Sequence, residues 1–456
     1  MTIADELASF VVKASYDDLS DAARKQMKIC ILDSLGCAIG ALDGEPIRFL
    51  RLQLEDFGGT GHSTLIGGGR TSPDRAAFYN SALTRYLDFN DFYLAKGESC
   101  HPSDNLGPVL AALEYAGGNG ADLMTALAVA YQVQARISDE APVRAKGFDH
   151  TTQGSYAVAA GVSKALRLDA ARTANAIALS GTPFNALRVT RTGALSHWKG
   201  LAYPNTAFSC THATFLAMRG ITGPPEVFEG NKGFMDSIAG RFHVDWPSEG
   251  LDRVTRIEVK KYNAEGHSQQ SVEGILELQA EHGFSGADVE KIEIDTFDVA
   301  FNIIGGGEEG DKTIVENKEQ ADHSLPYMVA VAILDGNVMP EQYAPERILR
   351  DDVQGLLRRV VARPNDSFSA RFPDEMPTTL KVTLRDGRVL VAEKTDYEGF
   401  HANPMRWETV VDKFEGLSAR YADASLRREI IESVEGLESL SVKDFVAPLD
   451  RVHVPD

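Results

Sequence analysis

The sequence contains few cysteines and no recognisable metal-binding pattern. Its 4 cysteines, Cys30, Cys37, Cys100 and Cys210, are scattered through 456 residues without CxxC spacing. Its 11 histidines are dispersed and form neither an HExxH motif nor a paired Cys/His motif. These absences argue against a disulfide framework, an iron–sulfur cluster and a zinc site. We therefore expect a protein without a metal or other cofactor.

Positive charge is also scarce. Lysine and arginine together number 46 against 66 aspartates and glutamates, which gives a formal net charge of −20. Such a balance disfavours nonspecific binding to nucleic acid or to an anionic membrane. It does not exclude a small anionic substrate, because lysines and histidines gathered in one cleft reverse the local field.

Long apolar runs are missing as well. No stretch approaches the roughly 20 apolar residues that span a bilayer. The first residues, MTIADELASFVV, lack a basic region followed by an apolar core, so they do not resemble a signal peptide. We therefore expect a cytoplasmic protein that does not contact the membrane.

The chain has two regions that differ in composition and in the spacing of their apolar residues. Residues 1 to about 265 are rich in alanine, leucine and glycine with apolar residues at helical spacing. Many small residues at core positions would let these helices approach closely. The helices predicted in this part of the chain cover residues 21–39, 75–87, 106–116, 121–137, 154–166 and 170–179.

From about residue 250 to 400 the pattern changes to a mixture of strands and helices. Residues 254–259 and 289–295 alternate apolar and polar side chains, which predicts half-buried strands. Residues 380–391 form a predicted hairpin in which Asp386-Gly387 supplies the positive φ angles of the turn. Further helices are predicted at residues 271–282, 327–334, 407–414 and 424–434.

The last of these helices should pack back on the first part of the chain. The domain division predicted is therefore an all-helical domain of residues 1–265 plus 400–456, and an α+β domain of residues 266–399.

The segment that contains residues 88–108 is the strongest candidate for chemistry. Asp88 and Asp91 lie three residues apart, and His101 follows in a polar stretch. Ser103 and Asp104 then precede an apolar run of helical spacing, which is typical of a helix N-cap. Carboxylates, an imidazole and an anion-attracting helix start together indicate proton transfer on an acidic substrate. The alternative is that the aspartates only cap turns and that His101 is an ordinary loop residue.

The same segment, DFNDFYLAKGESCHPSDN, resembles the signature of the MmgE/PrpD family, which includes 2-methylcitrate dehydratases and cis-aconitate decarboxylases. The resemblance implies a mainly α fold, in which a large all-helical domain carries a smaller α+β lid domain, usually in a homodimer. Further blocks follow in the family's order and cover nearly the whole chain. They are residues 27–36 (MKICILDSLG), 147–150 (GFDH), 192–200 (TGALSHWKG), 260–269 (KKYNAEGHSQ), 321–327 (ADHSLPY) and 403–407 (NPMRW).

The resemblance also implies a lyase that acts on a di- or tricarboxylate without a metal ion. Dehydration of 2-methylcitrate builds negative charge beside carboxylates that are already charged, so the site must supply cations and a proton carrier. Lys199 and Lys260 are the cations that the matched blocks indicate. The alternative for both is an ordinary solvated surface lysine.

The matched blocks give roles to the other catalytic candidates. His101 is predicted to transfer the proton, with Asp88 orienting or activating it, because an imidazole both donates and accepts protons near neutral pH. His150 and His267 are predicted to bind carboxylates or the leaving hydroxyl group, and Tyr327 to donate a hydrogen bond or a proton. A histidine that only completes buried hydrogen bonds, and a tyrosine that only packs in the core, are the alternatives.

The remaining candidates are predicted to shape the substrate pocket. Asp91 and Ser103 belong to the signature segment, and Thr192 and His197 to the block around Lys199. Phe92 departs from the family, because a threonine is common at this position and phenylalanine lacks its hydroxyl group. The substrate is therefore less firmly indicated than the family.

Three functions remain open on the sequence alone. The first is a metal-independent hydro-lyase acting on 2-methylcitrate or a similar tricarboxylate. The second is a cis-aconitate decarboxylase, or an epimerase of a related diacid, that uses the same residues. The third is a binding protein with a degenerate site, which Phe92 favours. The presence of Asp88, His101, Lys199 and His267 together weighs against the third.

Overall fold

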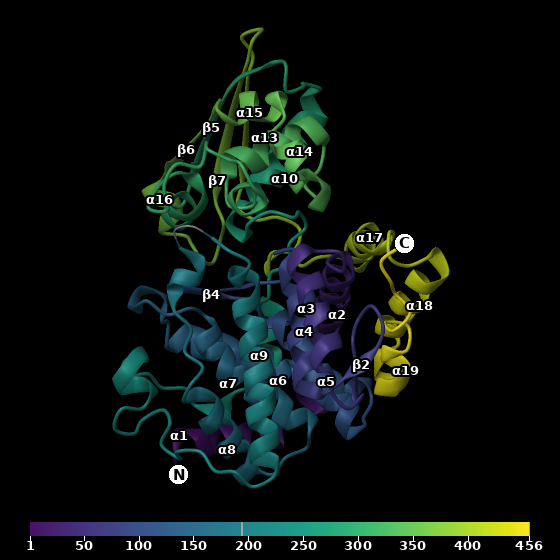
Figure 1. Ribbon diagram of the computed structural model, residues 1–456. Coiled ribbons are helices and arrows are strands. Elements are labelled where there is room, and N and C mark those ends of the chain that lie inside the picture. The colour runs from purple at the N-terminus through teal and green to yellow at the C-terminus, as the bar shows by residue number, and fades with distance from the viewer. Residues whose placement is uncertain (193–194, 456) are drawn as a thin grey trace. The chain divides into compact units, whose positions relative to one another are not determined.

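The computed structural model describes residues 1–192 and 195–455 (Figure 1). Within it the chain forms two compact units, which are described separately. The helical unit comprises Met1–Arg191, His197–Val259 and Arg406–Asp456, and the α+β unit comprises Thr192–Ser196 and Lys260–Met405. None of the described helices is both long enough and apolar enough to cross a membrane.

The helical unit is built around long buried helices, as the pattern of the first region predicts. Its α2 helix (Asp21–Gly40) begins where the Ser20 hydroxyl accepts a hydrogen bond from the Ala23 N–H, and it buries Cys30 and Cys37. The other helices and strands of this unit are α1 (Ile3–Lys13), α3 (Glu45–Phe57), β1 (Ser63–Thr64), β2 (Arg70–Thr71), α4 (Pro73–Tyr86), β3 (Tyr93–Ala95), β4 (Glu98–Cys100), α5 (Leu106–Ala116), α6 (Gly120–Glu140), α7 (Thr151–Ala165), α8 (Ala170–Gly181) and α9 (Trp198–Met218).

Glycines allow these helices to pack closely. A Cβ atom on Gly107 of α5 would lie 2.6 Å from the backbone nitrogen of Ser81 on α4. A Cβ atom on Gly161 of α7 would lie 2.9 Å from the Cβ atom of Ala130 on α6. Larger side chains at these positions would force the helices apart, so the alanine- and glycine-rich composition is a packing requirement.

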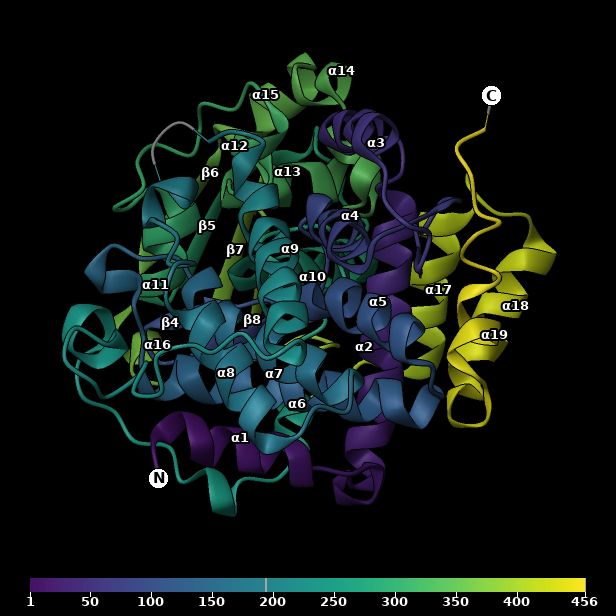
Figure 2. The same ribbon diagram turned by 60° about the horizontal axis from the view of Figure 1, so that its bottom comes forward.

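The C-terminal segment completes the helical unit. It forms α17 (Trp407–Ser418), α18 (Ala424–Glu435) and α19 (Val442–Val446). Figure 2 shows α17 beside α2, with α18 and α19 further out. On α17 the buried Lys413 forms an ion pair of 2.5 Å with the buried Asp33 of α2, and its Nζ also donates to the Phe89 carbonyl at 2.8 Å. Arg406–Asp456 thus belongs to the same compact unit as Met1–Arg191.

The α+β unit contains a four-stranded sheet with the order β6-β5-β7-β8. β5 (Val289–Thr296) pairs in parallel with β6 (Val360–Pro364) and antiparallel with β7 (Thr378–Leu384), which pairs antiparallel with β8 (Val389–Lys394). The helices α10 (Gln269–His282) and α13 (Leu325–Asp335) pack against the sheet (Figure 1). The shorter helices of this unit are α11 (Asp298–Ala300), α12 (Lys318–Ala321), α14 (Pro345–Ile348), α15 (Asp351–Leu357) and α16 (Asp366–Ser369).

The strand predicted at residues 254–259 is wrong. Asp252–Arg256 forms the 3₁₀ helix η7, in which the Thr255 hydroxyl donates to the Asp252 carbonyl at 2.7 Å. Only Glu258 pairs in a β-like manner, through an isolated bridge to Phe92. The alternation of apolar side chains here buries Ile257 and Val259 without a neighbouring strand.

The predicted hairpin is confirmed as β7 and β8, but its turn differs. Gly387 has a positive φ of 90°, whereas Asp386 is not among the described residues with positive φ. The Asp386 carboxylate instead accepts a hydrogen bond from the Arg388 N–H at 3.0 Å. The loop is therefore longer than the two-residue turn that Asp-Gly predicts.

Candidate active site

A buried arginine lies at the centre of the signature segment. Arg85, near the end of α4, is 3% exposed. Its Nη1 donates to Asp88 Oδ1 at 2.6 Å and to Asn90 Oδ1 at 3.3 Å, and its Nε lies 3.9 Å from Asp104 Oδ2. Burial alone would lower the pKa of Arg85, but the Asp88 carboxylate, and Asp104 when it is ionised, raise it. A fixed positive charge is therefore held among the acidic residues of the segment.

Arg85 also fixes the tautomer of His101. Its Nη2 lies 3.2 Å from His101 Nε2, and the other ring nitrogen, Nδ1, lies 2.8 Å from the Asp91 carbonyl oxygen. Because a guanidinium group only donates and a carbonyl only accepts, Nδ1 bears the proton and Nε2 presents a lone pair. His101 is thus held as a neutral imidazole that can accept a proton at Nε2.

Asp88 lies in a strained backbone conformation. Its φ of 54° falls in the left-handed region, which costs a residue other than glycine roughly 1 kcal/mol. Its carboxylate is held by Arg85 on one oxygen and by Lys199 Nζ, at 3.2 Å, on the other. Lys199 lies in the first turn of α9 and is 8% exposed, so it is not a solvated surface lysine. Such strain is common at functional sites.

Asp91 and Asp104 are buried on either side of this arrangement. Asp91 Oδ1 accepts from the Ser103 N–H at 3.0 Å and its Oδ2 from the Tyr131 hydroxyl at 2.8 Å. Burial raises the pKa of Asp91 to about 6, against the lowering effect of these hydrogen bonds. Burial likewise raises the pKa of Asp104 to about 8, although Arg85 opposes the shift. Asp104 therefore holds its proton at neutral pH.

Ser103 and Asp104 do not cap a helix as predicted. They lie in the 3₁₀ helix η2 (Pro102–Asn105), which precedes α5, and Asn105 occupies the N-cap position of α5 without a side-chain hydrogen bond. Asn90 Nδ2 donates instead to Ser103 Oγ at 2.9 Å and to Asp104 Oδ1 at 3.2 Å. Their role is to fix the loop that carries Asp88 and Asp91.

His150 lies next to His101, with ring centroids 5.5 Å apart. Its Nδ1 is 3.3 Å from Asp149 Oδ1, and the other oxygen of Asp149 accepts from Arg191 Nε at 2.5 Å. Burial lowers the pKa of His150 to about 3; Asp149 opposes this shift, and Arg191 and Arg85 add to it. The buried Nε2 of His150 makes no hydrogen bond in the described structure. His150 is therefore a second neutral imidazole, with a free nitrogen that a ligand could satisfy.

The α+β unit contains a second group of the predicted residues. Glu265 accepts from the His267 N–H at 2.8 Å and binds His267 Nδ1 at 2.7 Å. Burial would raise the pKa of Glu265, but the charges of His267, His323 and Lys260 and the hydrogen bond from His267 lower it to about 2. His267 is 4% exposed and Lys260 2%. Lys260 is thus buried near an ionised carboxylate.

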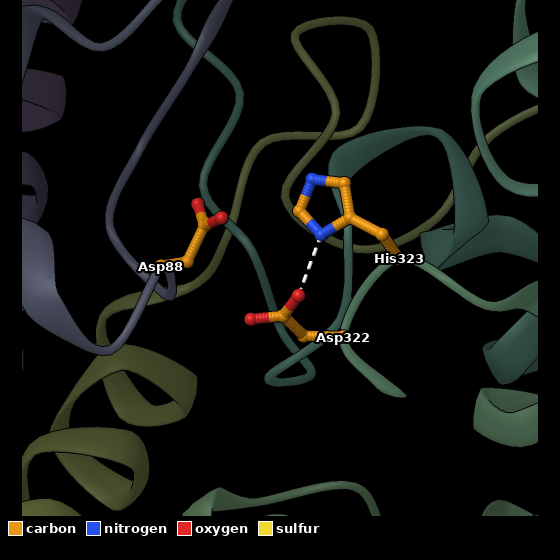
Figure 3. Close-up of side chains that lie close together, drawn as sticks. All are labelled: Asp88, Asp322 and His323. Atoms are coloured by element: carbon orange, nitrogen blue, oxygen red, sulfur yellow. Dashed lines mark hydrogen bonds and ion pairs between the residues drawn. The ribbon is translucent and has the colours of Figure 1, made fainter. Parts of the chain in front are cut away.

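A second carboxylate–imidazole pair lies in the same unit. His323 Nδ1 is 2.6 Å from Asp322 Oδ1 (Figure 3), and Lys318 Nζ is 2.8 Å from Asp322 Oδ2. Asp322 is 3% exposed in its side chain and His323 18%. His323 also contributes to the lowering of the Glu265 pKa, after the larger effect of His267.

Four predicted residues are not brought into these groups by any contact described here. Phe92 is 3% exposed and its backbone pairs with Glu258. Thr192 is exposed, and His197 is an exposed residue whose Nε2 lies 3.3 Å from Glu45 Oε2 on α3. Tyr327 lies in the core of the α+β unit, where its hydroxyl donates to the Gln342 carbonyl. Their roles in substrate binding or catalysis stay predictions.

Sequence reasoning missed the charged groups that organise the site. Arg85 could have been noticed as a cation three residues before Asp88 in an otherwise apolar helix end. Glu265, Asp322 and His323 lie within segments 260–269 and 321–327, which resemble the family, but the sequence predicted no role for them. Arg191 carries no signal of its own, because only the fold brings it to Asp149.

Neither unit, taken alone, gathers three described His, Cys, Asp or Glu side chains closely enough to hold a metal ion. A cavity of about 480 Å³ in the helical unit, lined in part by Tyr16, Asp122, Lys164 and Arg167, contains none of the predicted site residues. Arg167 is paired there with Asp122 at 3.0 Å. This cavity is therefore not a candidate active site, unlike the groups around Arg85 and Glu265.

Comparison with known proteins identifies relatives along the whole chain. Residues 5–247 match the profile of the MmgE/PrpD N-terminal domain, and residues 262–439 match that of the MmgE/PrpD C-terminal domain. A 2-methylcitrate dehydratase of Salmonella typhi is 28% identical over 90% of this chain and 85% of its own length. A 2-methylcitrate dehydratase of Escherichia coli K12 is 27% identical over 95% of this chain and 94% of its own length. A cis-aconitate decarboxylase of Mus musculus is 25% identical over 96% and 91%, respectively.

Proposed function

The chain belongs to the MmgE/PrpD family and is a lyase, and we propose that it removes water from 2-methylcitrate or a similar tricarboxylate without a metal ion. The observation that carries this proposal is the buried group formed by Arg85, Asp88, Lys199 and His101. It combines a proton-accepting imidazole with cations that are suited to carboxylates.

Dehydration needs a base for the carbon-bound proton and charge to stabilise the transition state. We assign the base to His101, because its Nε2 presents a lone pair rather than a proton. A proton accepted there displaces the hydrogen bond from Arg85, and the Asp88 carboxylate offsets the added charge. Asp88 acts on His101 through Arg85, which binds both side chains.

The two lysines serve the substrate's carboxylates in this proposal. Lys199 exchanges part of its contact with Asp88 for a carboxylate of the substrate. Lys260, which is 2% exposed, is assigned to a substrate carboxylate as well. His150 and His267 hydrogen-bond carboxylates or the leaving hydroxyl group, and for His150 the unsatisfied Nε2 is the contacting atom. Asp91 and Ser103 support the loop beneath these groups.

The test is a substrate panel. Purified protein is incubated with 2-methylcitrate, citrate and related hydroxy acids, and the absorbance of the conjugated double bond is followed. Formation of an unsaturated tricarboxylate supports the proposal. Absence of turnover with every hydroxy acid, together with carbon dioxide release from cis-aconitate, would replace it with the decarboxylase.

The decarboxylase is the second candidate because the mouse relative is a cis-aconitate decarboxylase. Phe92, where the resemblance implies threonine, is a position at which the substrate could differ from 2-methylcitrate. The Phe92→Thr variant tests whether the residue at this position sets the choice between the two substrates. The quantity compared is the ratio of turnover of 2-methylcitrate to turnover of cis-aconitate. A higher ratio in the variant than in the wild type would show that Phe92 sets the choice of substrate.

Metal independence is part of the proposal and is tested separately. Dialysis against a chelator, followed by addition of iron, zinc or magnesium, should leave the rate unchanged. Loss of activity on chelation with recovery on one metal would overturn this part alone.

We also propose a cytoplasmic homodimer. On α3 the side chains of Phe49 and Leu52 are 54% and 59% exposed, and Trp198 at the start of α9 is 46% exposed. Apolar side chains gathered in this way favour burial against a second copy. Light scattering on the purified protein should give twice the chain mass of 49.6 kDa.

A further inference from the structure

The Asp322–His323 pair has the arrangement of a proton-transferring imidazole. Asp322 Oδ1 binds His323 Nδ1 at 2.6 Å, so the ring is oriented with Nε2 directed away from the carboxylate (Figure 3). Lys318 holds the other oxygen of Asp322 at 2.8 Å. In acyl-transfer enzymes, a buried carboxylate orients the catalytic histidine in the same way, through a hydrogen bond to one nitrogen of its ring.

The backbone on either side of His323 is also fixed. Its N–H donates to the Gln320 carbonyl at 3.3 Å at the end of α12. The next residue, Ser324, caps α13 by accepting from the Tyr327 N–H at 3.1 Å. The imidazole is therefore carried on a short connection between two helices, with little freedom to move away.

His323 is better placed to meet a substrate than its neighbour His267. The His323 side chain is 18% exposed, whereas His267 is 4% exposed and lies beside the stacked rings of Phe297 and Phe372, with centroids 5.8 and 5.7 Å away. Both imidazoles and Lys260 act electrostatically on Glu265. A polar substrate that reaches Lys260 would therefore find His323 as the more open imidazole of this unit.

We propose that His323 is a catalytic acid that protonates the departing hydroxyl group, oriented by Asp322 as its positioning residue; this rests on the proposed dehydration. In the step, the C–O bond breaks and its electron pair stays on oxygen, which takes the Nε2 proton of the imidazolium and leaves as water. A separate base takes the proton from the adjacent carbon, and the C–H electron pair becomes the second bond of the alkene. His323 regains its proton from solvent before the next turnover.

The first test compares His323→Gln with a matched control. His282 likewise follows an acidic residue, Glu281, but its Nε2 lies 3.8 Å from that carboxylate and both side chains are exposed to solvent at 34% and 76%. We expect His323→Gln to lower kcat about 100-fold or more while KM changes less than about threefold, and His282→Gln to leave both unchanged. A kcat of His323→Gln within threefold of wild type would overturn the proposal.

The second test separates leaving-group protonation from a structural role. A substrate analogue with fluorine in place of the leaving hydroxyl group expels fluoride, which needs much less help from an acid. We expect His323→Gln and Asp322→Asn to lose about 100-fold and about 10-fold on the hydroxy acid, and to approach wild-type rates on the fluoro analogue. Equal losses on both compounds would overturn the assignment. If the wild-type enzyme dehydrates no hydroxy acid, the proposed function fails instead.

Discussion

In the helical unit the imidazole of His101 lies beside a guanidinium group, whereas in the α+β unit those of His267 and His323 lie beside carboxylates. His101 accepts from Arg85, and the pKa of His150 is lowered to about 3 by burial with the help of Arg191 and Arg85. His267 and His323 each direct Nδ1 to a carboxylate, that of Glu265 or Asp322. A ring nitrogen that faces a guanidinium group accepts a hydrogen bond, and one that faces a carboxylate donates.

This difference suggests that the two units contribute different groups to proton transfer. A dehydration needs one group that starts without a proton and another that starts with one. We infer that His101 of the helical unit is the proton acceptor and that His323 of the α+β unit is the proton donor.

The largest effect is expected from removing the buried guanidinium. Arg85→Met removes one of the cations that bind Asp88 and the donor to His101 Nε2, so the unfolding free energy should fall by about 3–5 kcal/mol and turnover by about 100-fold or more. Arg136, which binds Glu249 at 2.8 Å but is 13% exposed in its side chain, provides the control. Urea unfolding of both variants checks this prediction. Equal stability of Arg85→Met and Arg136→Met would contradict it.

His101→Gln should reduce kcat about 100-fold or more, because the acceptor of the carbon-bound proton is lost. The control is His212→Gln on α9, where the histidine is 58% exposed in its side chain and lies 3.4 Å from Asp74. Steady-state kinetics give kcat of both variants on the hydroxy acid and on its fluoro analogue. His101→Gln should be slow on both compounds, and recovery on the fluoro analogue would contradict its role as base.

Asp104 should make the helical unit less stable as the pH rises. Its folded pKa of about 8 lies above the ordinary value of about 4, so the folded protein holds a proton that the unfolded chain has lost. Stability that is present at pH 4 is therefore lost progressively as the pH rises towards 8. Asp104→Asn removes this loss, and its advantage over wild type should grow with pH to about 2 kcal/mol or more at pH 9.

Thermal unfolding between pH 5 and pH 9 measures the effect of Asp104→Asn. The control is Asp169→Asn, since the pKa of this exposed N-cap residue is lowered, first by the backbone hydrogen bond from Arg172. The stability difference of the control should be constant over this range. A constant difference for Asp104→Asn as well would show that Asp104 is ionised at neutral pH.

The smallest effect is expected at His197. Its imidazole is exposed and pairs with Glu45 rather than with the groups around Arg85. Exposed ion pairs contribute little, so His197→Ala should change KM less than about twofold. A KM increase of tenfold or more would restore the pocket role that the sequence predicts for this residue.

Much of the helical unit could be predicted because local patterns are strong there. The helix predicted at residues 106–116 coincides with α5, and the periodicity at 21–39 with α2. The strand predicted at 254–259 failed because alternation only reports which side chains are buried. Without a neighbouring strand, that stretch buried the same side chains in a 3₁₀ helix and an isolated bridge.

The site was predictable only in part. Asp88, His101 and Lys199 could be named from their segments, and the structure joins them through Arg85. The burial of the Arg85 guanidinium could not be predicted, because an arginine three residues from an aspartate normally forms a solvated surface pair. Only the tertiary packing of α4 against its neighbours buries Arg85.

The tautomer of His101 tests the contrast between the two units most directly. Nitrogen NMR of protein labelled with ¹⁵N-histidine, with His101→Gln used to assign the signal, reports which ring nitrogen bears the proton at neutral pH. We expect a protonated Nδ1 and an unprotonated Nε2. A proton on Nε2 at neutral pH would contradict the assignment of His101 as the proton acceptor.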